Sequence, residues 1–312
     1  MREFIKAGDQ HIIFPFYHVV SNDALPHITH LYQARNVAAF ERDMDFLLRN
    51  FTPLHFDDLV SGRFQPDTPY FHLSFDDGLA EMYHIVRPIL LEKGIPATFF
   101  INSAFVNDQA LMYRYKVSLL LEKVPAPDLE AAVKSLGGES TFRVHDVKRF
   151  LLQLDAARED IIDRIATTVG FDFRSYTAAH ALYMHESHME TMLKEGFTLG
   201  AHSVDHPEFA HIAPAAQLAQ VQLSVDYIRN RFNSKHPPFA FPFTADGVDQ
   251  SVFNTMYTEY GVSRSFGTAG LQKSRIHPQH IDRIPAEYAD WPLEHIVKAE
   301  YHYFLAKKML GR

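Results

Sequence analysis

The chain has 312 residues, a formal net charge of −8 and no cysteine. This length suits one large α/β barrel domain or two small domains. The absence of cysteine excludes disulfides, thiolate metal sites and cysteine nucleophiles, and the acidic balance excludes the basic surface of a nucleic-acid binder.

Short apolar segments alternate with amphipathic ones along the chain, which predicts an α/β barrel or a layered sheet. The segment 97–101 reads Ala-Thr-Phe-Phe-Ile, without alternation of apolar and polar residues. Such a run predicts a strand that is buried on both faces. The expected strands span residues 12–17, 71–75, 97–101, 196–200 and 239–243.

Helices are expected between these strands and at the end of the chain. Apolar residues recur at helical spacing over 37–51. Pro88 fits the first turn of a helix, and Gly94 is a natural end for that helix. The last helix is expected over 293–310, with lysines near its C-terminus, where a positive charge opposes the helix dipole.

The segment from about residue 107 to 190 has no strand pattern. It reads as helices and turns, with helices expected over 115–121, 144–154 and 161–169. We therefore expect a single domain over residues 1–312, with a helical insertion at about 107–190.

The N-terminal segment lacks the apolar run of a signal peptide. No stretch approaches the roughly 20 apolar residues of a membrane span. These features predict a cytoplasmic protein and leave a periplasmic location open.

Two histidines four residues apart, His202 and His206, follow the expected strand 196–200. Their side chains can converge on one metal ion, and neutral imidazole is the commonest metal ligand. In a chain with 19 histidines, a surface or core pair is the alternative interpretation. The position favours a metal site, because active sites of parallel barrels lie at the C-terminal ends of the strands.

Residues 74–78 read Ser-Phe-Asp-Asp-Gly and place Asp76 and Asp77 at the end of an expected strand. Adjacent carboxylates repel each other unless a positive charge neutralises them, and a divalent cation would do so. Helix capping is the alternative, and it explains the polar pair Asp57 and Asp58 well. The apolar strand before Asp76 favours a catalytic role for the first pair.

The two segments together offer one carboxylate and two imidazoles to a metal ion. Three protein ligands with open positions are typical of a catalytic rather than a structural site. The second carboxylate is then left to accept a proton from water. The spacing alone does not decide which of Asp76 and Asp77 has which role.

These segments resemble the motifs of the polysaccharide deacetylases, carbohydrate esterase family 4 with its NodB-homology domain. Residues 74–78 are similar to the Thr/Ser-Phe-Asp-Asp-Gly motif, and residues 202–206 to the His-Ser/Thr-x-x-His motif. Residues 239–243 resemble the third motif, a strand that ends in Pro-aromatic, and residues 95–101 resemble the strand after the first motif. The resemblance spans roughly residues 12–287, and its first two motifs are specific.

The resemblance implies a distorted (β/α)7-type barrel and a metal-dependent deacetylase. By this resemblance Asp76 is the base. Pro242 and Phe243 would lie at the substrate, and the backbone N–H of Phe243 would help to hold the oxyanion, which is a large catalytic contribution. The expected cofactor is a divalent metal ion, zinc first, with cobalt, manganese, nickel or iron as alternatives. The implied metal ligands are Asp77, His202 and His206.

The chain departs from the family pattern in two places. The third motif lacks the usual arginine that orients the base, and Arg283 is either its substitute or part of a structural ion pair. The late Leu-x-Ile-x-His motif, which carries the catalytic acid, is not evident. Residues 16–20 resemble a strand end of the poly-N-acetylglucosamine deacetylase branch, where motif order is permuted, so His18 is the candidate acid, with a core histidine as the alternative. His277 and His280 are weaker candidates that we expect at the surface.

Three functions stay open from the sequence. The first is removal of N-acetyl groups from an amino sugar in a polysaccharide, an oligosaccharide or a sugar precursor. The second is an O-acetyl esterase, or an amidohydrolase that acts on a non-sugar amide with the same fold. The third is a catalytically impaired, carbohydrate-binding homologue. Tyr17, Phe209 and Trp291 are candidates for stacking on a sugar ring, with core or rim packing as the alternative.

Overall fold

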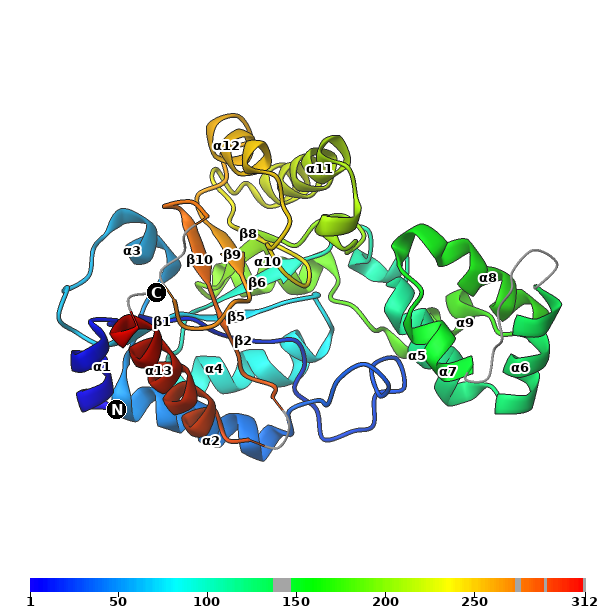
Figure 1. The fold of residues 1–312 in the computed structure, drawn as a ribbon, viewed down its shortest axis with the longest axis horizontal. Helices are drawn as coiled ribbons and strands as arrows, with labels where there is room; N and C mark the ends of the chain where they lie inside the picture. The colour runs from blue at the N-terminus through cyan, green and yellow to red at the C-terminus, as the bar shows by residue number, and fades with distance from the viewer. Residues whose placement is uncertain (137–146, 273–275, 289–290, 311–312) are drawn as a thin grey trace.

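The computed structural model describes residues 1–136, 147–272, 276–288 and 291–310. Figure 1 shows parallel strands surrounded by helices, with a group of helices that projects to one side. The strands are β1 (Ile12–Ile13), β2 (Pro15–Tyr17), β3 (Thr52–Pro53), β4 (Tyr70–Phe71), β5 (Leu73–Phe75), β6 (Ala97–Ile101), β7 (Thr198–Ala201), β8 (Phe239–Ala240), β9 (Ser265–Gly267), β10 (His280–Asp282) and β11 (Ile284–Pro285).

The helices cover the barrel and form the projecting group. They are α1 (Arg2–Gly8), α2 (Val37–Asn50), α3 (Phe56–Ser61), α4 (Arg87–Lys93), α5 (Tyr113–Lys123), α6 (Ala126–Ser135), α7 (Val147–Leu152), α8 (Glu159–Thr168), α9 (Phe173–His180), α10 (Glu186–Lys194), α11 (Pro214–Phe232), α12 (Gln250–Thr258) and α13 (Leu293–Met309). Four short helical segments complete the set: the π-helix Met82–Val86 and the 3-10 turns Val106–Asp108, Ala156–Arg158 and Phe209–His211.

Eight parallel strand segments form the main sheet, in the order β10-β9-β8-β7-β6-β5-β2-β11. The two outer segments, β10 and β11, are consecutive along the chain and are separated only by Arg283. The N–H of Arg283 donates to the carbonyl of Gly267 in β9, and the N–H of Ile284 donates to the carbonyl of Phe14 beside β2. One broken strand therefore joins both edges of the sheet, and the predicted distorted (β/α)7-type barrel is confirmed.

Two of the expected strands are each divided into two shorter ones. The strand expected over 12–17 is interrupted at Phe14, and the strand expected over 71–75 is interrupted at His72. Their first halves, β1 and β4, pair with each other in a small sheet, in which β4 also pairs with β3, whereas β2 and β5 pair within the barrel. Because the chain changes sheets at these two residues, one apolar run yields two strands.

Strand β6 lies between β5 and β7 in the barrel, and all five of its residues are buried. This confirms the prediction from its unbroken apolar run. Aromatic rings cover both faces of this strand. On the face toward helix α2 the rings of Phe75 and Phe99 stack with their centroids 5.0 Å apart, and on the other face Phe100 contacts Phe266. Gly200 makes room for the ring of Phe100, because a Cβ atom at this position would lie 2.5 Å from that ring.

The helix ends follow local sequence signals. Helix α4 ends at Gly94, whose φ of 64° is left-handed, so the predicted end is confirmed. Pro88 lies in the first turn of α4, which continues directly from the π-helix Met82–Val86. The side chain of Asn36 caps α2 by accepting the N–H of Ala39 at 2.8 Å. None of the helices in the described ranges combines the length and apolar character that a membrane crossing needs.

Helices α5 to α10 occupy the chain between β6 and β7, where the sequence predicts only helices and turns. In Figure 1 the helices α5 to α9 form the projecting group, to one side of the strands. The helix expected over 144–154 is observed as α7, and its first three residues lie outside the described ranges. The assignment of residues 1–312 to one domain with this insertion stays a prediction.

Candidate metal centre

Asp76 and Asp77 follow the last residue of β5, and His202 follows the last residue of β7. These strands flank β6 on either side, and all three are parallel. Their C-terminal ends therefore meet at one rim of the barrel, where the active sites of parallel barrels are built. The two motifs that the sequence singles out come together at this rim, although more than 120 residues separate them.

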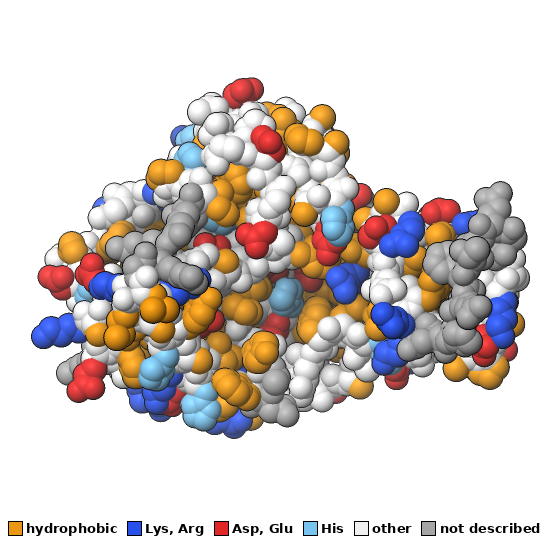
Figure 2. Space-filling view, in the orientation of Figure 1, with side chains coloured by type: hydrophobic (Ala, Val, Ile, Leu, Met, Phe, Trp, Pro, Cys, Tyr) orange, Lys and Arg blue, Asp and Glu red, His pale blue; other side chains and the backbone are white. Residues whose placement is uncertain are grey.

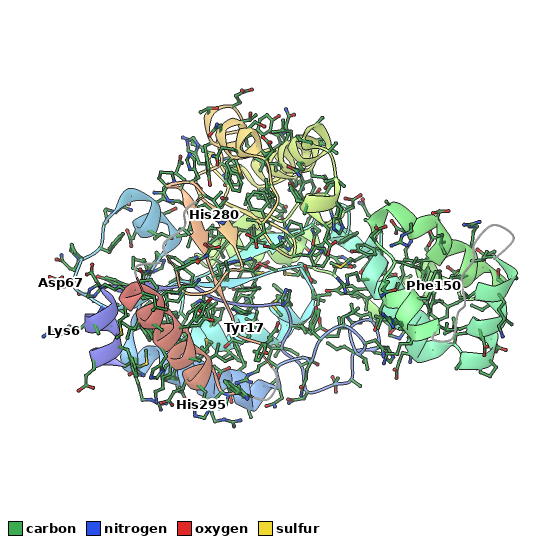
Figure 3. All side chains as sticks on the ribbon, in the orientation of Figure 1. Lys6, Tyr17, Asp67, Phe150, His280 and His295 are labelled. Carbon is green, nitrogen blue, oxygen red and sulfur yellow. The ribbon has the colours of Figure 1, made fainter. Side chains whose placement is uncertain are left out.

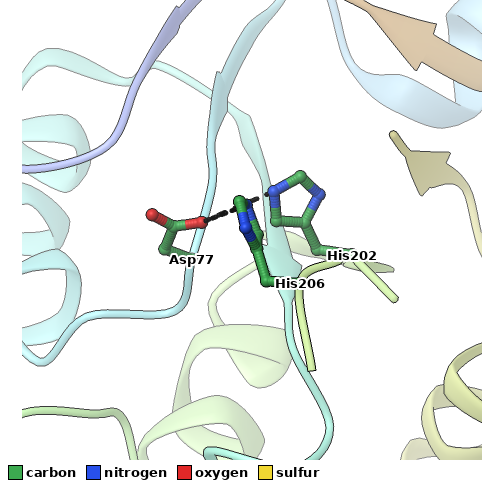
Figure 4. Close-up of side chains that lie close together, drawn as sticks. All are labelled: Asp77, His202 and His206. Carbon is green, nitrogen blue, oxygen red and sulfur yellow. Dashed lines mark ion pairs between the residues drawn. The ribbon is translucent and has the colours of Figure 1, made fainter. Parts of the chain in front are cut away.

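Asp77, His202 and His206 form a compact buried group, which Figure 4 shows in close-up. The Nε2 atoms of His202 and His206 lie 3.4 and 3.3 Å from the same oxygen, Oδ1 of Asp77. A tetrahedral site with ligand bonds of about 2.1 Å places its ligand atoms about 3.4 Å apart. The spacing of these three side chains therefore fits a divalent cation.

The hydrogen bonds of Asp77 and His202 leave free the atoms that would bind a metal ion. Within the described chain, Oδ1 of Asp77 is buried and has no hydrogen-bond partner. An unsatisfied buried carboxylate oxygen is costly, and a bound cation would satisfy it. Nδ1 of His202 lies 2.8 Å from the carbonyl of Ala240, so Nδ1 carries the proton and Nε2 presents its lone pair to the site.

The charge states also suit a cation site. Burial by itself would raise the pKa of Asp77, but the adjacent imidazoles of His206 and His202 hold that pKa well below its usual range. Burial lowers the pKa of His206, and this effect outweighs the attraction of Asp77. The group therefore consists of an ionised carboxylate and, at His206, a neutral imidazole, which are the forms that bind metal ions.

Several backbone conformations at the site are strained. Asp77, Ser203, His206 and Phe243 have φ values of 70°, 66°, 61° and 58°, in the left-handed region that favours glycine. Only nine non-glycine residues of the described chain have positive φ, and four of them cluster here. Such strain concentrates at functional sites, because the surrounding fold must hold it in place.

Asp76 is fixed by Arg283, which is fully buried. Nη1 and Nη2 of the guanidinium each donate to one oxygen of Asp76, both at 2.7 Å. Burial would raise the pKa of Asp76, but the charge of Arg283 lowers it. Arg283 therefore forms a buried structural ion pair, which is one of its two alternative roles. Its partner in that pair is the candidate base Asp76, so Arg283 also orients the base, which is the other role.

His18 lies at the end of β2, and its side chain is 30% exposed, so it is not a core histidine. Its Nδ1 is 2.7 Å from Oε2 of Glu287, and the same carboxylate accepts the N–H groups of His18 and Val19. Burial would lower the pKa of His18, but the hydrogen bond and charge of Glu287 outweigh it and raise this pKa to about 9. At neutral pH His18 therefore carries a proton that it can donate.

Phe243 lies beside the metal ligands, and its ring contacts the ring of His206 with centroids 4.7 Å apart. Its carbonyl accepts the hydroxyl of Thr268 at 2.7 Å, whereas no hydrogen bond within the described residues uses its N–H. The preceding Pro242 is buried just beyond the end of β8 and adds no donor. This backbone N–H is therefore available to a ligand, as the oxyanion hypothesis requires.

Two candidates for sugar stacking are core residues, and one prediction of a surface residue is wrong. Tyr17 and Phe209 cannot stack on a sugar, because Tyr17 is fully buried with its hydroxyl on Asp43, and Phe209 is 1% exposed. Tyr17 packs between β2 and helix α2, where its ring contacts Phe40, and Figure 3 labels Tyr17 and His280 on their strands. His280 is not a surface residue, because it lies buried in β10 with Nδ1 2.7 Å from the hydroxyl of Ser265. Trp291 remains available, with 49% of its surface exposed.

Two residues at the site carry no signal in the sequence. Glu287 contacts His18 although 269 positions separate them in the sequence. Tyr115 belongs to helix α5, and its hydroxyl donates to Oδ2 of Asp77 at a distance of 2.8 Å. Neither belongs to a motif, so only their position in space identifies them. The face shown in Figure 2 is hollowed near its centre, where histidine and acidic side chains lie among hydrophobic ones.

Comparison with known proteins gives a family match and several similar folds. The model of the polysaccharide deacetylase family matches residues 65–256. The deacetylase PplD of Streptococcus pyogenes, solved in complex with acetate, is similar at 14% identity with a TM-score of 0.60, over 93% of this chain and 97% of that one. IcaB from Ammonifex degensii is similar at 14% identity with a TM-score of 0.58, over 92% and 96%.

A third solved structure extends this set. The de-N-acetylase from Aggregatibacter actinomycetemcomitans is similar at 13% identity with a TM-score of 0.56, over 91% of this chain and 99% of that one. At these identities the likeness shows a shared fold. A comparison with curated proteins gives no significant match.

Proposed function

Because the chain belongs to the polysaccharide deacetylase family, we propose that it is a metal-dependent hydrolase that removes N-acetyl groups from an amino sugar. The substrate would be a polysaccharide, an oligosaccharide or a sugar precursor that carries such groups. The buried group of one carboxylate and two imidazoles, beside a second carboxylate held by an arginine, carries this proposal. The name of the similar de-N-acetylase supports the choice of an amide over an ester.

Asp77, His202 and His206 would hold the divalent cation, with zinc first and cobalt, manganese, nickel or iron as alternatives. A bound cation would supply Lewis acidity, which polarises the acetamide carbonyl and makes water more acidic.

The chain's own groups divide the proton transfers between them. Asp76 accepts a proton from the attacking water, and Arg283 keeps that carboxylate ionised and oriented. The N–H of Phe243 donates to the carbonyl oxygen as it gains negative charge. His18 gives its proton to the nitrogen while the C–N bond breaks, so that acetate and a free amine leave.

The test is acetate release from N-acetylglucosamine oligomers after the chelator-treated protein is loaded with zinc, cobalt or manganese. We expect release only with metal bound, and faster turnover of the amide than of an O-acetylated sugar. Faster ester turnover would favour the O-acetyl esterase. Sugar binding without turnover at stoichiometric metal would contradict the enzyme and favour the carbohydrate-binding homologue.

The pair of His18 and Glu287 yields a prediction for pH dependence. A general acid works only while it is protonated, so activity should fall as the pH rises through the pKa of His18. Glu287→Gln removes the negative charge that raises this pKa, so the alkaline limb of kcat/KM should move to lower pH by about 1–3 units. The matched control is Glu122→Gln, which alters a His–Glu contact with His30 at the surface. An alkaline limb that stays in place would argue against His18 as the acid.

Trp291 yields a prediction for substrate length. It lies four residues beyond Glu287 in the chain, and about half of its surface is exposed. If it stacks on a sugar beyond the reacting one, Trp291→Ala should raise KM for oligomers about 2–10-fold and leave KM for a monosaccharide unchanged. Tyr303→Ala, at an exposed aromatic residue of α13, serves as the control. If Trp291→Ala has the same KM for oligomers as the wild type, Trp291 only packs at the rim and does not stack on a sugar.

A further inference from the structure

Helix α5 belongs to the helical segment between β6 and β7, yet it contacts the proposed metal centre directly. The hydroxyl of Tyr115 donates to Oδ2 of Asp77 at 2.8 Å. The neighbouring Arg114 places its guanidinium carbon 5.2 Å from the ring centroid of Phe243. One helix thus contacts both a candidate metal ligand and the residue that offers the oxyanion N–H.

The two oxygens of Asp77 have separate partners. Oδ1 faces the Nε2 atoms of His202 and His206, whereas Oδ2 accepts the hydroxyl of Tyr115. The terminal torsion of an aspartate is broad, so a carboxylate with one free oxygen can rotate. The hydrogen bond from Tyr115 removes this freedom and leaves Oδ1 directed at the two imidazoles.

The donor in the hydrogen bond between Tyr115 and Asp77 is unambiguous. An ionised carboxylate only accepts hydrogen bonds, so the proton of Tyr115 lies toward Asp77. The hydroxyls of Tyr32 and Tyr115 are 3.0 Å apart, and Tyr32 must therefore be the donor in that pair. A chain of two hydroxyls thus points toward Asp77, and each bond strengthens the next.

Packing fixes the position of the Tyr115 hydroxyl. The side chain is 1% exposed, and its ring contacts the rings of His27 and Tyr183, at centroid distances of 5.3 and 6.3 Å. The hydroxyl of Ser118, one turn further along α5, donates to the carbonyl of Pro26 at 2.7 Å. The helix is therefore tied to the loop that carries Tyr32.

We propose that Tyr115 is a positioning residue that holds the Asp77 carboxylate in the orientation for metal binding. Helix α5 is then a part of the metal centre, supported from behind by Tyr32. The inference rests on the proposed function, because it takes Asp77 as a metal ligand. It assigns to the helical segment a role in the site that no motif of the sequence predicts.

The test is the affinity of the full chain for Zn²⁺ alone, measured by competition with a chelating dye. Tyr115→Phe removes one hydroxyl and keeps the ring, and we expect it to weaken zinc binding about 10–100-fold. Tyr32→Phe should give a smaller loss. The matched control is Tyr183→Phe, in the same group of rings, whose hydroxyl accepts the N–H of Met112 and does not contact Asp77. This control should keep the affinity of the wild type.

Thermal unfolding in the presence of chelator separates a structural role from a metal role. A merely structural Tyr115 would lower the metal-free melting temperature and leave the zinc affinity unchanged, and this result would overturn the inference. If Tyr115→Phe does not fold, Tyr32→Phe decides: weaker zinc binding than in Tyr183→Phe supports the role, and equal binding overturns it. A wild type that binds no zinc, cobalt or manganese would instead remove the proposed function, and this inference with it.

Discussion

Asp76→Asn is expected to lower kcat for acetate release by about 10²–10⁴-fold while the metal stays bound. Asparagine has nearly the same shape but cannot accept the proton of the attacking water. Asp77, His202 and His206 are unchanged, so the ligands of the cation remain in place. The measurement is kcat with N-acetylglucosamine oligomers, together with the metal content of the purified variant.

The control for this variant is Asp57→Asn. Asp57 belongs to the chain's other pair of adjacent aspartates and lies exposed in the first turn of α3. We expect it to keep the kcat of the wild type. The role of Asp76 as base would be wrong if Asp76→Asn kept full activity on an accepted substrate. A variant that lost its metal as well as its activity would contradict the division of roles between Asp76 and Asp77.

Arg283→Met is expected to lower the free energy of unfolding by about 3–5 kcal/mol. The guanidinium is fully buried and donates to both oxygens of Asp76, so its removal leaves a buried carboxylate without its counter-ion. Activity should fall as well, because the base loses the group that orients it. The measurement is urea unfolding in the presence of chelator, which separates this loss from any contribution of bound metal.

A double variant tests the physical reason for this loss. In Asp76→Asn/Arg283→Met no charge is left unpaired, so we expect it to be more stable than Arg283→Met alone. The control for a surface ion pair is Arg63→Met, because Arg63 contacts Asp58 at 3.0 Å with 68% of its side chain exposed. Exposed pairs contribute about 0–1 kcal/mol. Equal stability of Arg283→Met and Arg63→Met would show that the buried pair does not stabilise the fold.

Local patterns of the sequence predict a large part of the fold. The uninterrupted apolar run over 97–101 predicts a fully buried strand, and β6 confirms it. Gly94 marks the end of α4 because glycine adopts the left-handed backbone there without strain, and Pro88 fits the first turn of α4 because its φ is already helical. These predictions succeed because the determining interactions lie within a few residues of one another.

Other features of the fold depend on partners that are distant in the sequence. The apolar runs over 12–17 and 71–75 each read as one strand, yet each divides at a single residue where the chain passes from the small sheet to the barrel. The exposure of a side chain is decided in the same way. Tyr17 has the residue type of a sugar-stacking group, but the packing of helix α2 against the barrel buries it completely.

The sequence by itself determined the types of ligand and their places at strand ends: two carboxylates after β5 and two histidines four residues apart after β7. It also determined the parallel α/β pattern that brings such ends to one rim. Only the tertiary structure decided how these groups are held. Arg283 meets Asp76 across 207 positions, Glu287 meets His18 across 269, and Tyr115 reaches Asp77 from a helix outside every motif. The physical reason is that hydrogen bonds and ion pairs act over about 3 Å in space, and only closure of the barrel and the packing of α5 against its rim bring these distant residues within that range.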